Sequence, residues 1–177
     1  ITDIEDKEII EENMLKLNVE LKKHQVDIAI MPEMLGNHQI EENFKEIFSE
    51  FPDDGCENCP LIVFPSIWSN HHNIVTVFNE QGDIVIQQEK QHPFLYTISK
   101  DERYLEDIQP EKKISLIHCD GVGRIAILIC KDALMIEYIQ MVLNILKVTL
   151  LIIPSFSTGN YDFQEIVQCF RSADCCV

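Results

Sequence analysis

The stretch Arg124-Ile-Ala-Ile-Leu-Ile-Cys130-Lys-Asp132 decides how this sequence is interpreted. The six residues before Cys130 predict a buried strand, and the cysteine stands at its carboxyl end, where a helix is expected to begin. In open α/β sheets, ligands and chemistry collect at that edge. A thiol placed there is a candidate nucleophile if neighbouring groups favour the loss of its proton.

Two other strand ends offer partners for this thiol. The segment Asp27-Ile-Ala-Ile-Met-Pro-Glu33 places a carboxylate just after a predicted strand. The segment Gln87-Gln-Glu-Lys90 places an amine just past the second arm of a predicted hairpin, whose turn is Asn79-Glu-Gln-Gly82. The sequence therefore supplies a carboxylate, an ammonium and a thiol, each at the end of a strand.

Helical and strand patterns alternate along the chain, which predicts a mixed sheet covered by helices. Amphipathic periodicity predicts helices over residues 4–23, 38–51, 134–147 and 161–173. Apolar runs predict strands over residues 26–31, 61–64, 73–78, 83–87, 113–117, 124–129 and 149–153. The stretch 91–110 is expected to be an irregular, polar loop. With 177 residues and no visible linker, the chain is expected to form one domain, 1–177.

Charge and composition exclude several kinds of partner. The net charge of −16 argues against nucleic acid and against an anionic membrane surface. No apolar run approaches the length of a membrane span, and no signal peptide is visible. Seven cysteines, mostly in apolar segments, indicate free thiols in a reducing cytoplasm.

The cysteines also raise the question of a metal site. Cys56-Glu-Asn-Cys59 has the spacing of zinc ligands, but no second pair accompanies it, and His71-His72 are not at a recognised ligand spacing. A plain loop is therefore the preferred interpretation, and no metal is expected.

Taken in order, Glu33, Lys90 and Cys130 with their preceding strands resemble the nitrilase (carbon–nitrogen hydrolase) superfamily. The motifs are an apolar strand ending in Pro-Glu, a lysine after a glycine-turn hairpin, and a strand ending in Ile-Cys-x-Asp. Further similarities cover nearly the whole chain: Phe64-Pro-Ser-Ile-Trp68 with Asn73, Leu151-Ile-Ile-Pro-Ser155, and Phe170-Arg171-Ser-Ala173.

The resemblance implies an α/β fold, a nitrilase-like α-β-β-α sandwich with mixed sheets. It also implies that the chain is incomplete at both ends, because it lacks the family's first strand and its C-terminal third. Members commonly pair into homodimers or higher homo-oligomers through helices. The helices expected at 134–147 or 161–173 could serve this purpose here.

The resemblance further implies a cysteine hydrolase with no cofactor, acting on a small amide, carbamoyl compound or nitrile. Cys130 would attack the substrate carbon and form a thioester, while Glu33 would accept and return the proton. Lys90 and the backbone N–H of Lys131 would stabilise the oxyanion. A second glutamate would position substrate and water; Glu102 is the first candidate, with Asp101 and Glu106 as competitors.

Other residues near these motifs have both a functional and a structural interpretation. Asp132 is expected to anchor the turn after the nucleophile through backbone N–H groups. Ser155 would border the mouth of the pocket or simply belong to a strand-to-helix turn. His92 would line the pocket or lie in a surface loop.

A non-catalytic interpretation stays open. Cys130 taken alone resembles a buried structural cysteine. Lys131 stands where the family commonly has an aromatic residue, and Ala133-Leu134-Met135 replace an aromatic-Pro-Glu element. The alternative function is therefore a binding or regulatory domain on a nitrilase-like fold within a longer protein.

Overall fold

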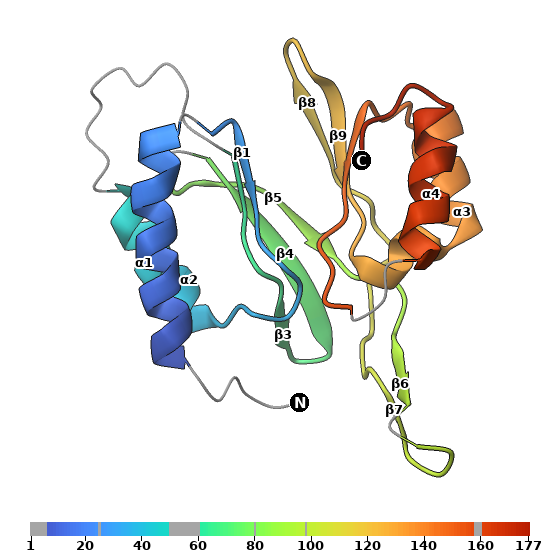
Figure 1. Ribbon diagram of the computed structural model, residues 1–177, viewed down its shortest axis with the longest axis horizontal. Helices are drawn as coiled ribbons and strands as arrows, with labels where there is room; N and C mark the ends of the chain where they lie inside the picture. Colours follow the sequence, from blue (N-terminus) through green and yellow to red (C-terminus); the bar gives the residue numbers. More distant parts are fainter. Residues whose placement is uncertain (1–6, 25, 50–60, 80, 98, 158–160) are drawn as a thin grey trace.

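The chain forms four layers, with helices outside and two sheets facing each other inside (Figure 1). A computed structural model describes residues 7–24, 26–49, 61–79, 81–97, 99–157 and 161–177. Cys56 and Cys59, the candidate zinc pair, lie outside the described residues.

The first sheet is mixed and has the strand order β1-β2-β4-β3, with β5 also paired to β4. The strands are β1 (Ile28–Ile30), β2 (Leu61–Val63), β3 (Ile67–Ser69), β4 (His72–Phe78) and β5 (Ile84–Glu89). β1 and β2 run parallel, and the other pairs are antiparallel. Its outer face is covered by α1 (Lys7–His24) and α2 (His38–Ser49).

The second sheet has the order β10-β9-β8. Its strands are β8 (Leu116–Cys119), β9 (Gly123–Ile127) and β10 (Leu150–Ile152), with β10 parallel and β8 antiparallel to β9. α3 (Ile136–Gln140) and α4 (Tyr161–Arg171) lie outside it. The mixed character of both sheets confirms the predicted fold class.

Three apolar clusters hold the layers together. The first lies between α1, α2 and the first sheet and includes Phe44, Phe64 and Phe78, whose rings are 5.2–6.5 Å apart. The second lies between the second sheet and its helices, around Val142 and Phe170. The third joins the two sheets. Its members include the following residues of both: Val63, Val75, Val77, Ile125, Ile127 and Ile129. The apolar end of β9 is buried on both faces, because Ile125 and Ile127 belong to the third cluster and Ala126 to the second.

The helix predicted over 134–147 begins two residues later and changes type before its end. A separate 3-10 helix covers Cys130–Leu134, and Met135, in an extended conformation (φ −88°, ψ 119°), divides it from α3. α3 continues with helical backbone angles into a π-helical turn that covers Met141–Ile145. Apolar periodicity therefore predicted the helix but not the change in its hydrogen bonds.

The loop predicted over 91–110 is not irregular throughout. It contains a hairpin of β6 (Leu95–Thr97) and β7 (Arg103–Leu105), which projects from the body of the molecule (Figure 1). The predicted strand 113–117 begins only at Leu116, because the chain before it bonds to a side chain. Gln88 donates a hydrogen bond to the carbonyl of Lys113 and accepts one from the N–H of Ser115.

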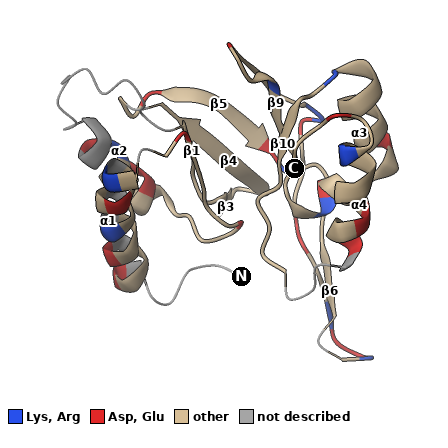
Figure 2. Ribbon diagram, turned by 45° about the horizontal axis from the view of Figure 1, so that its top comes forward, with Lys and Arg blue, Asp and Glu red and all other residues tan. Residues whose placement is uncertain are grey.

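Acidic residues lie on the helices and also on loops and strand ends, and they are not gathered at one place (Figure 2). Among the described residues, no helix is both long and apolar enough to cross a membrane.

Candidate active site

The three residues predicted to react come together where the two sheets meet. Glu33 follows β1 and Lys90 follows β5, both strands of the first sheet, while Cys130 follows β9 of the second. All three are buried, with 2%, 1% and 6% of their surface exposed, respectively. Burial of a carboxylate and an ammonium costs several kcal/mol per ion unless they are paired, so their contacts decide what this site can do.

Lys90 is held between two carboxylates. Its Nζ lies 2.7 Å from Glu33 Oε1 and 2.7 Å from Glu106 Oε2. Burial lowers the pKa of Lys90, but the charges and hydrogen bonds of Glu33 and Glu106 outweigh it, and the pKa is raised above its usual 10.5. Lys90 is therefore a permanent cation at neutral pH.

Asn73 joins the same two carboxylates from β4. Its Nδ2 donates to Glu33 Oε1 over 3.1 Å and to Glu106 Oε1 over 2.9 Å. Its backbone carbonyl accepts the N–H of Lys90 over 2.8 Å. Because an amide group has two N–H donors and no charge, Asn73 positions both carboxylates without neutralising them.

Glu33 and the backbone N–H of Phe156 both act on the pKa of the Cys130 thiol, Glu33 raising it and the Phe156 N–H lowering it. Burial raises the pKa of this thiol to about 11; the charge of Glu33 and its hydrogen bond add to the effect, and the charge of Lys90 opposes it. The resting group is thus a neutral thiol with a carboxylate near enough to act on its pKa.

The backbone at Cys130 has φ +47°, in the left-handed region. This conformation costs an L-residue roughly 1–2 kcal/mol, and strain of this kind persists where the surrounding structure demands it. Here the hydrogen bond from Cys130 N–H to the carbonyl of Pro154, at 2.9 Å, helps to hold it.

Glu106, and not Glu102, is the second glutamate of this cluster. Glu102 is exposed near the end of the β6–β7 hairpin and accepts a hydrogen bond from the hydroxyl of Tyr104. Asp101 is exposed on the same connection. The choice of Glu102 came from treating the segment as an irregular loop. Once β6 and β7 are paired, the residue just after β7 returns to the base of the hairpin, next to Phe94.

The structure also places the other predicted site residues, Asp132, Lys131 and Ser155. Asp132 is fully buried and accepts backbone N–H bonds as expected, but from Gln91 and His92 and not from the turn that follows Cys130. Lys131 is half-buried beside Cys130. The Ser155 hydroxyl donates to the carbonyl of Ile153, a local turn contact.

Two residues of this site were not singled out for these roles. Asn73 bridges the two carboxylates, and the Phe156 N–H lies near the thiol. Both roles depend on contacts between segments that are distant in the sequence. The signals available for Asn73 were its place in the family resemblance and its polarity at the start of the apolar strand β4.

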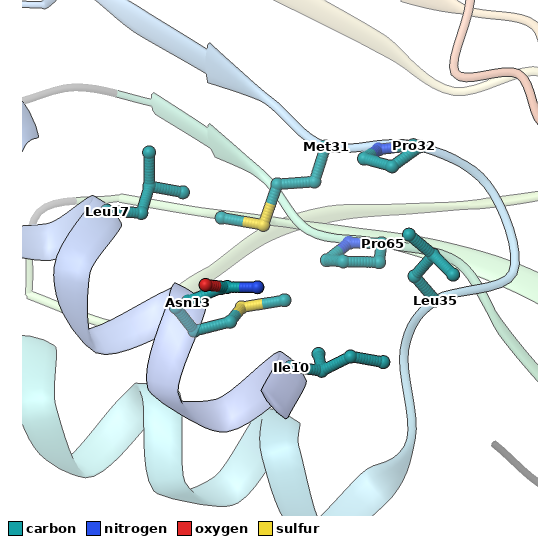
Figure 3. A pocket seen from close by; sticks show the side chains of 8 residues that line it. Ile10, Asn13, Leu17, Met31, Pro32, Leu35 and Pro65 are labelled. Atoms are coloured by element: carbon teal, nitrogen blue, oxygen red, sulfur yellow. The ribbon is translucent and has the colours of Figure 1, made fainter. Parts of the chain in front are cut away.

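A hollow of about 170 Å³ lies elsewhere, between α1 and the segment that follows β1 (Figure 3). Its walls are formed by Ile10, Asn13, Met14, Leu17, Met31, Pro32, Leu35 and Pro65. None of these side chains is titratable, so this hollow offers no reacting group. In the part of the chain that the structure describes, no group of three or more His, Cys, Asp or Glu side chains could hold a metal ion.

Solved structures with a similar fold include members of the nitrilase superfamily and a glutamine-dependent NAD+ synthetase. The glutamine-dependent NAD+ synthetase from Acinetobacter baumannii superposes with a TM-score of 0.70 at 14% identity, over 97% of this chain and 35% of its own. Saccharomyces cerevisiae Nit3, of branch 10 of the nitrilase superfamily, has a TM-score of 0.62 at 18% identity, over 93% and 65%. The nitrilase-superfamily amidase of Nesterenkonia AN1 has a TM-score of 0.59 at 11% identity, over 85% and 62%.

The chain thus has the fold of the nitrilase superfamily and spans about one third to two thirds of the length of these proteins. No protein-family model matches the sequence, and no curated protein matches it.

Proposed function

We propose that this chain carries the reacting site of a hydrolase that cleaves a non-peptide C–N bond in a small amide, carbamoyl compound or nitrile. The observation that supports this most strongly is the contact of Glu33 with both Lys90 and Cys130, which come from three separate strand ends. The fold shared with Nit3 and the Nesterenkonia amidase supports the reaction class. That amidase has been captured with acrylamide added to its active-site cysteine.

In this proposal the thiol of Cys130 attacks the substrate carbonyl carbon as its proton passes to Glu33. Because the resting thiol is neutral, proton transfer accompanies the attack and does not precede it. Lys90, and the backbone N–H of Lys131, stabilise the oxyanion that forms. Glu33 then gives its proton to the departing nitrogen, the C–N bond breaks, and a thioester remains.

Water completes the reaction. Glu33 takes a proton from the water as its oxygen attacks the thioester carbon, and the thiol leaves with that proton. For an amide the balance is one amide and one water converted to one carboxylic acid and one amine or ammonia; a nitrile consumes two waters to give the acid and ammonia. Asn73 and Glu106 hold Glu33 and Lys90 in place throughout, which is why they are assigned positioning roles.

The test is release of ammonia or amine from a panel of small amides, carbamoyl compounds and nitriles. Cys130→Ala should lower the rate at least about 10⁴-fold, because no other group replaces the nucleophile. Cys119→Ala, which changes a half-buried thiol on β8, serves as the matched control and should keep the rate. Turnover retained by Cys130→Ala would overturn the mechanism.

A binding or regulatory domain is the second candidate, and the raised pKa of Cys130 favours it, since an inert buried thiol has the same property. Labelling with iodoacetamide separates the two. The charge of Lys90 lowers the pKa of the Cys130 thiol, so a labelling rate for Cys130 that falls when Lys90 is replaced supports the nucleophile. A rate that does not change on this replacement supports the binding domain.

We also propose a homodimer in the cytoplasm. Among the exposed apolar side chains are Ile136, Met141 and Ile145 on α3 and the π-helical turn after it, and five described cysteines are free thiols. Gel filtration at micromolar concentration should show twice the mass of the chain. A monomer would count against this assembly.

A further inference from the structure

Asp132 is a buried charge that the proposed reaction does not use. It lies two residues after Cys130, in the 3-10 helix, and its surface is 0% exposed. Its Oδ2 accepts the N–H of Gln91 over 2.9 Å, and its Oδ1 accepts the N–H of His92 over 2.7 Å. One carboxylate therefore joins the turn that carries the cysteine to the loop that follows Lys90.

The side chain of His92 completes this contact. Its Nδ1 lies 3.1 Å from Asp132 Oδ1. Since a carboxylate only accepts hydrogen bonds, Nδ1 must carry the hydrogen and donate it. The other side of the ring meets Tyr138 of α3 edge-on, with 5.1 Å between the ring centroids. The imidazole is thus held between the 3-10 helix and α3.

These bonds cross from one sheet to the other. Lys90 follows β5 of the first sheet, and Cys130 follows β9 of the second. Between the sheets lies an apolar cluster, and apolar contact is non-directional. It brings the sheets together, but it does not by itself set how far the ammonium of Lys90 lies from the thiol of Cys130. Hydrogen bonds to one rigid carboxylate have the direction that this requires.

We propose that Asp132 and His92 form a clamp that sets the position of Lys90 relative to Cys130. They are positioning residues, since neither touches the reacting atoms. The inference rests on the proposed function, because only a reaction at Cys130 needs the lysine there. An error of about 1 Å in such a placement can cost about 100-fold in rate.

The experiment measures the iodoacetamide labelling rate of Cys130 in the whole chain between about pH 7 and pH 9, the range below the thiol's midpoint. The charge of Lys90 opposes the rise of the Cys130 pKa. If the clamp loosens and Lys90 moves away, the thiol should lose its proton less readily and label more slowly across this range.

Two substitutions of His92 form a matched pair. His92→Asn places an amide N–H close to where the imidazole Nδ1–H lies, so the wild-type labelling rate should be kept. His92→Gln places its amide nearer the position of Nε2 and loses the bond to Asp132, so labelling should slow roughly three- to tenfold. His118→Gln, at an exposed histidine of β8, controls for a general effect of losing an imidazole.

Equal labelling rates for His92→Gln and wild type, in proteins of equal melting temperature, would overturn the clamp. Asp132→Asn should slow labelling further, because it removes an acceptor from one of the two backbone N–H groups. If Asp132→Asn does not fold, the comparison of His92→Asn with His92→Gln still tests the clamp. Labelling needs no substrate, so failure of the clamp can be told apart from failure of the proposed hydrolase. If the wild type turns over substrate and His92→Gln labels Cys130 at the wild-type rate, the clamp alone is rejected. If His92→Gln slows labelling but the wild type shows no turnover, only the proposed function is rejected.

Discussion

The buried cluster around Lys90 and the hairpin of β6 and β7 are opposites in what they bury and what they expose. The cluster encloses three charged side chains, Glu33, Lys90 and Glu106, with at most 10% of each side chain exposed. The hairpin exposes large apolar side chains on both strands, with Leu95 at 45% and Leu105 at 64%. The two regions meet at Glu106, directly after β7.

The difference lies in how each region is restrained. Each charged side chain of the cluster is bonded to at least two partners, so these bonds fix the positions of all three side chains. In the hairpin, Leu95 pairs with Leu105 and Tyr96 with Tyr104, which places apolar side chains on both faces of a two-stranded ribbon. Such a ribbon is marginally stable in isolation. Its base is tied by two bonds between Glu106 and Phe94, from N–H to carbonyl at 2.8 Å and from N–H to carboxylate at 3.0 Å.

The strongest way to break the cluster is to remove its cation. Lys90→Met leaves two carboxylates buried without a counter-charge, and breaking a buried pair in this way costs about 3–5 kcal/mol. Urea unfolding should show this loss, together with loss of turnover. Lys100→Met, at an exposed lysine of the hairpin connection, should change the free energy of unfolding by less than about 0.5 kcal/mol. Similar losses in both variants would mean that Lys90 is not specially held.

A second change tests which glutamate belongs to the cluster. Glu106→Gln removes the charge 2.7 Å from Lys90 and should cost about 1.5–3 kcal/mol, the range for a hydrogen bond to a charged group. Glu102→Gln changes only an exposed contact with Tyr104 and should leave stability and turnover unchanged. An equal effect of the two substitutions would contradict the assignment of Glu106.

Alkaline pH should weaken the cluster without any substitution. The pKa of Cys130 is raised from 9.0 to about 11, and that of Lys90 is raised above 10.5. In both cases the folded state keeps its proton longer than the unfolded state, so this part of the stability is complete at neutral pH. The part from Cys130 is lost as the pH rises from about 9 toward 11, and the part from Lys90 only above 10.5.

The part of this loss that comes from Cys130 is roughly 1–2 kcal/mol after allowance for solvent screening. Cys130→Ala should therefore flatten the fall between pH 9 and pH 11, as measured by unfolding at a series of pH values. An identical fall in that variant would show that Cys130 does not titrate as described.

The hairpin should respond least. Leu105→Thr replaces an exposed leucine by a good strand former, and the free energy of unfolding should change by less than about 0.5 kcal/mol. A larger loss would mean that another surface covers the hairpin in solution. Sedimentation of the wild type and the variant would then show whether that surface is a second copy of the chain.

The two regions also differed in how far the sequence predicted them. Glu33, Lys90 and Cys130 follow strands with clear apolar runs, and the structure brings all three together. The hairpin was treated as an irregular loop because its strands have three residues each and expose their apolar side chains, so no buried pattern marks them. That single omission led to Glu102 in place of Glu106.

The sequence by itself determined the alternation of helices and strands, the mixed α/β class and the three strand ends that hold a carboxylate, an amine and a thiol. These are local properties, because periodicity and chain punctuation act over a few residues. Only the tertiary structure decided which glutamate lies beside Lys90, that Asn73 joins the two carboxylates, and that Asp132 bonds to the loop after Lys90. Those contacts span 16 to 41 residues, and their distances depend on strand register and on how the two sheets pack.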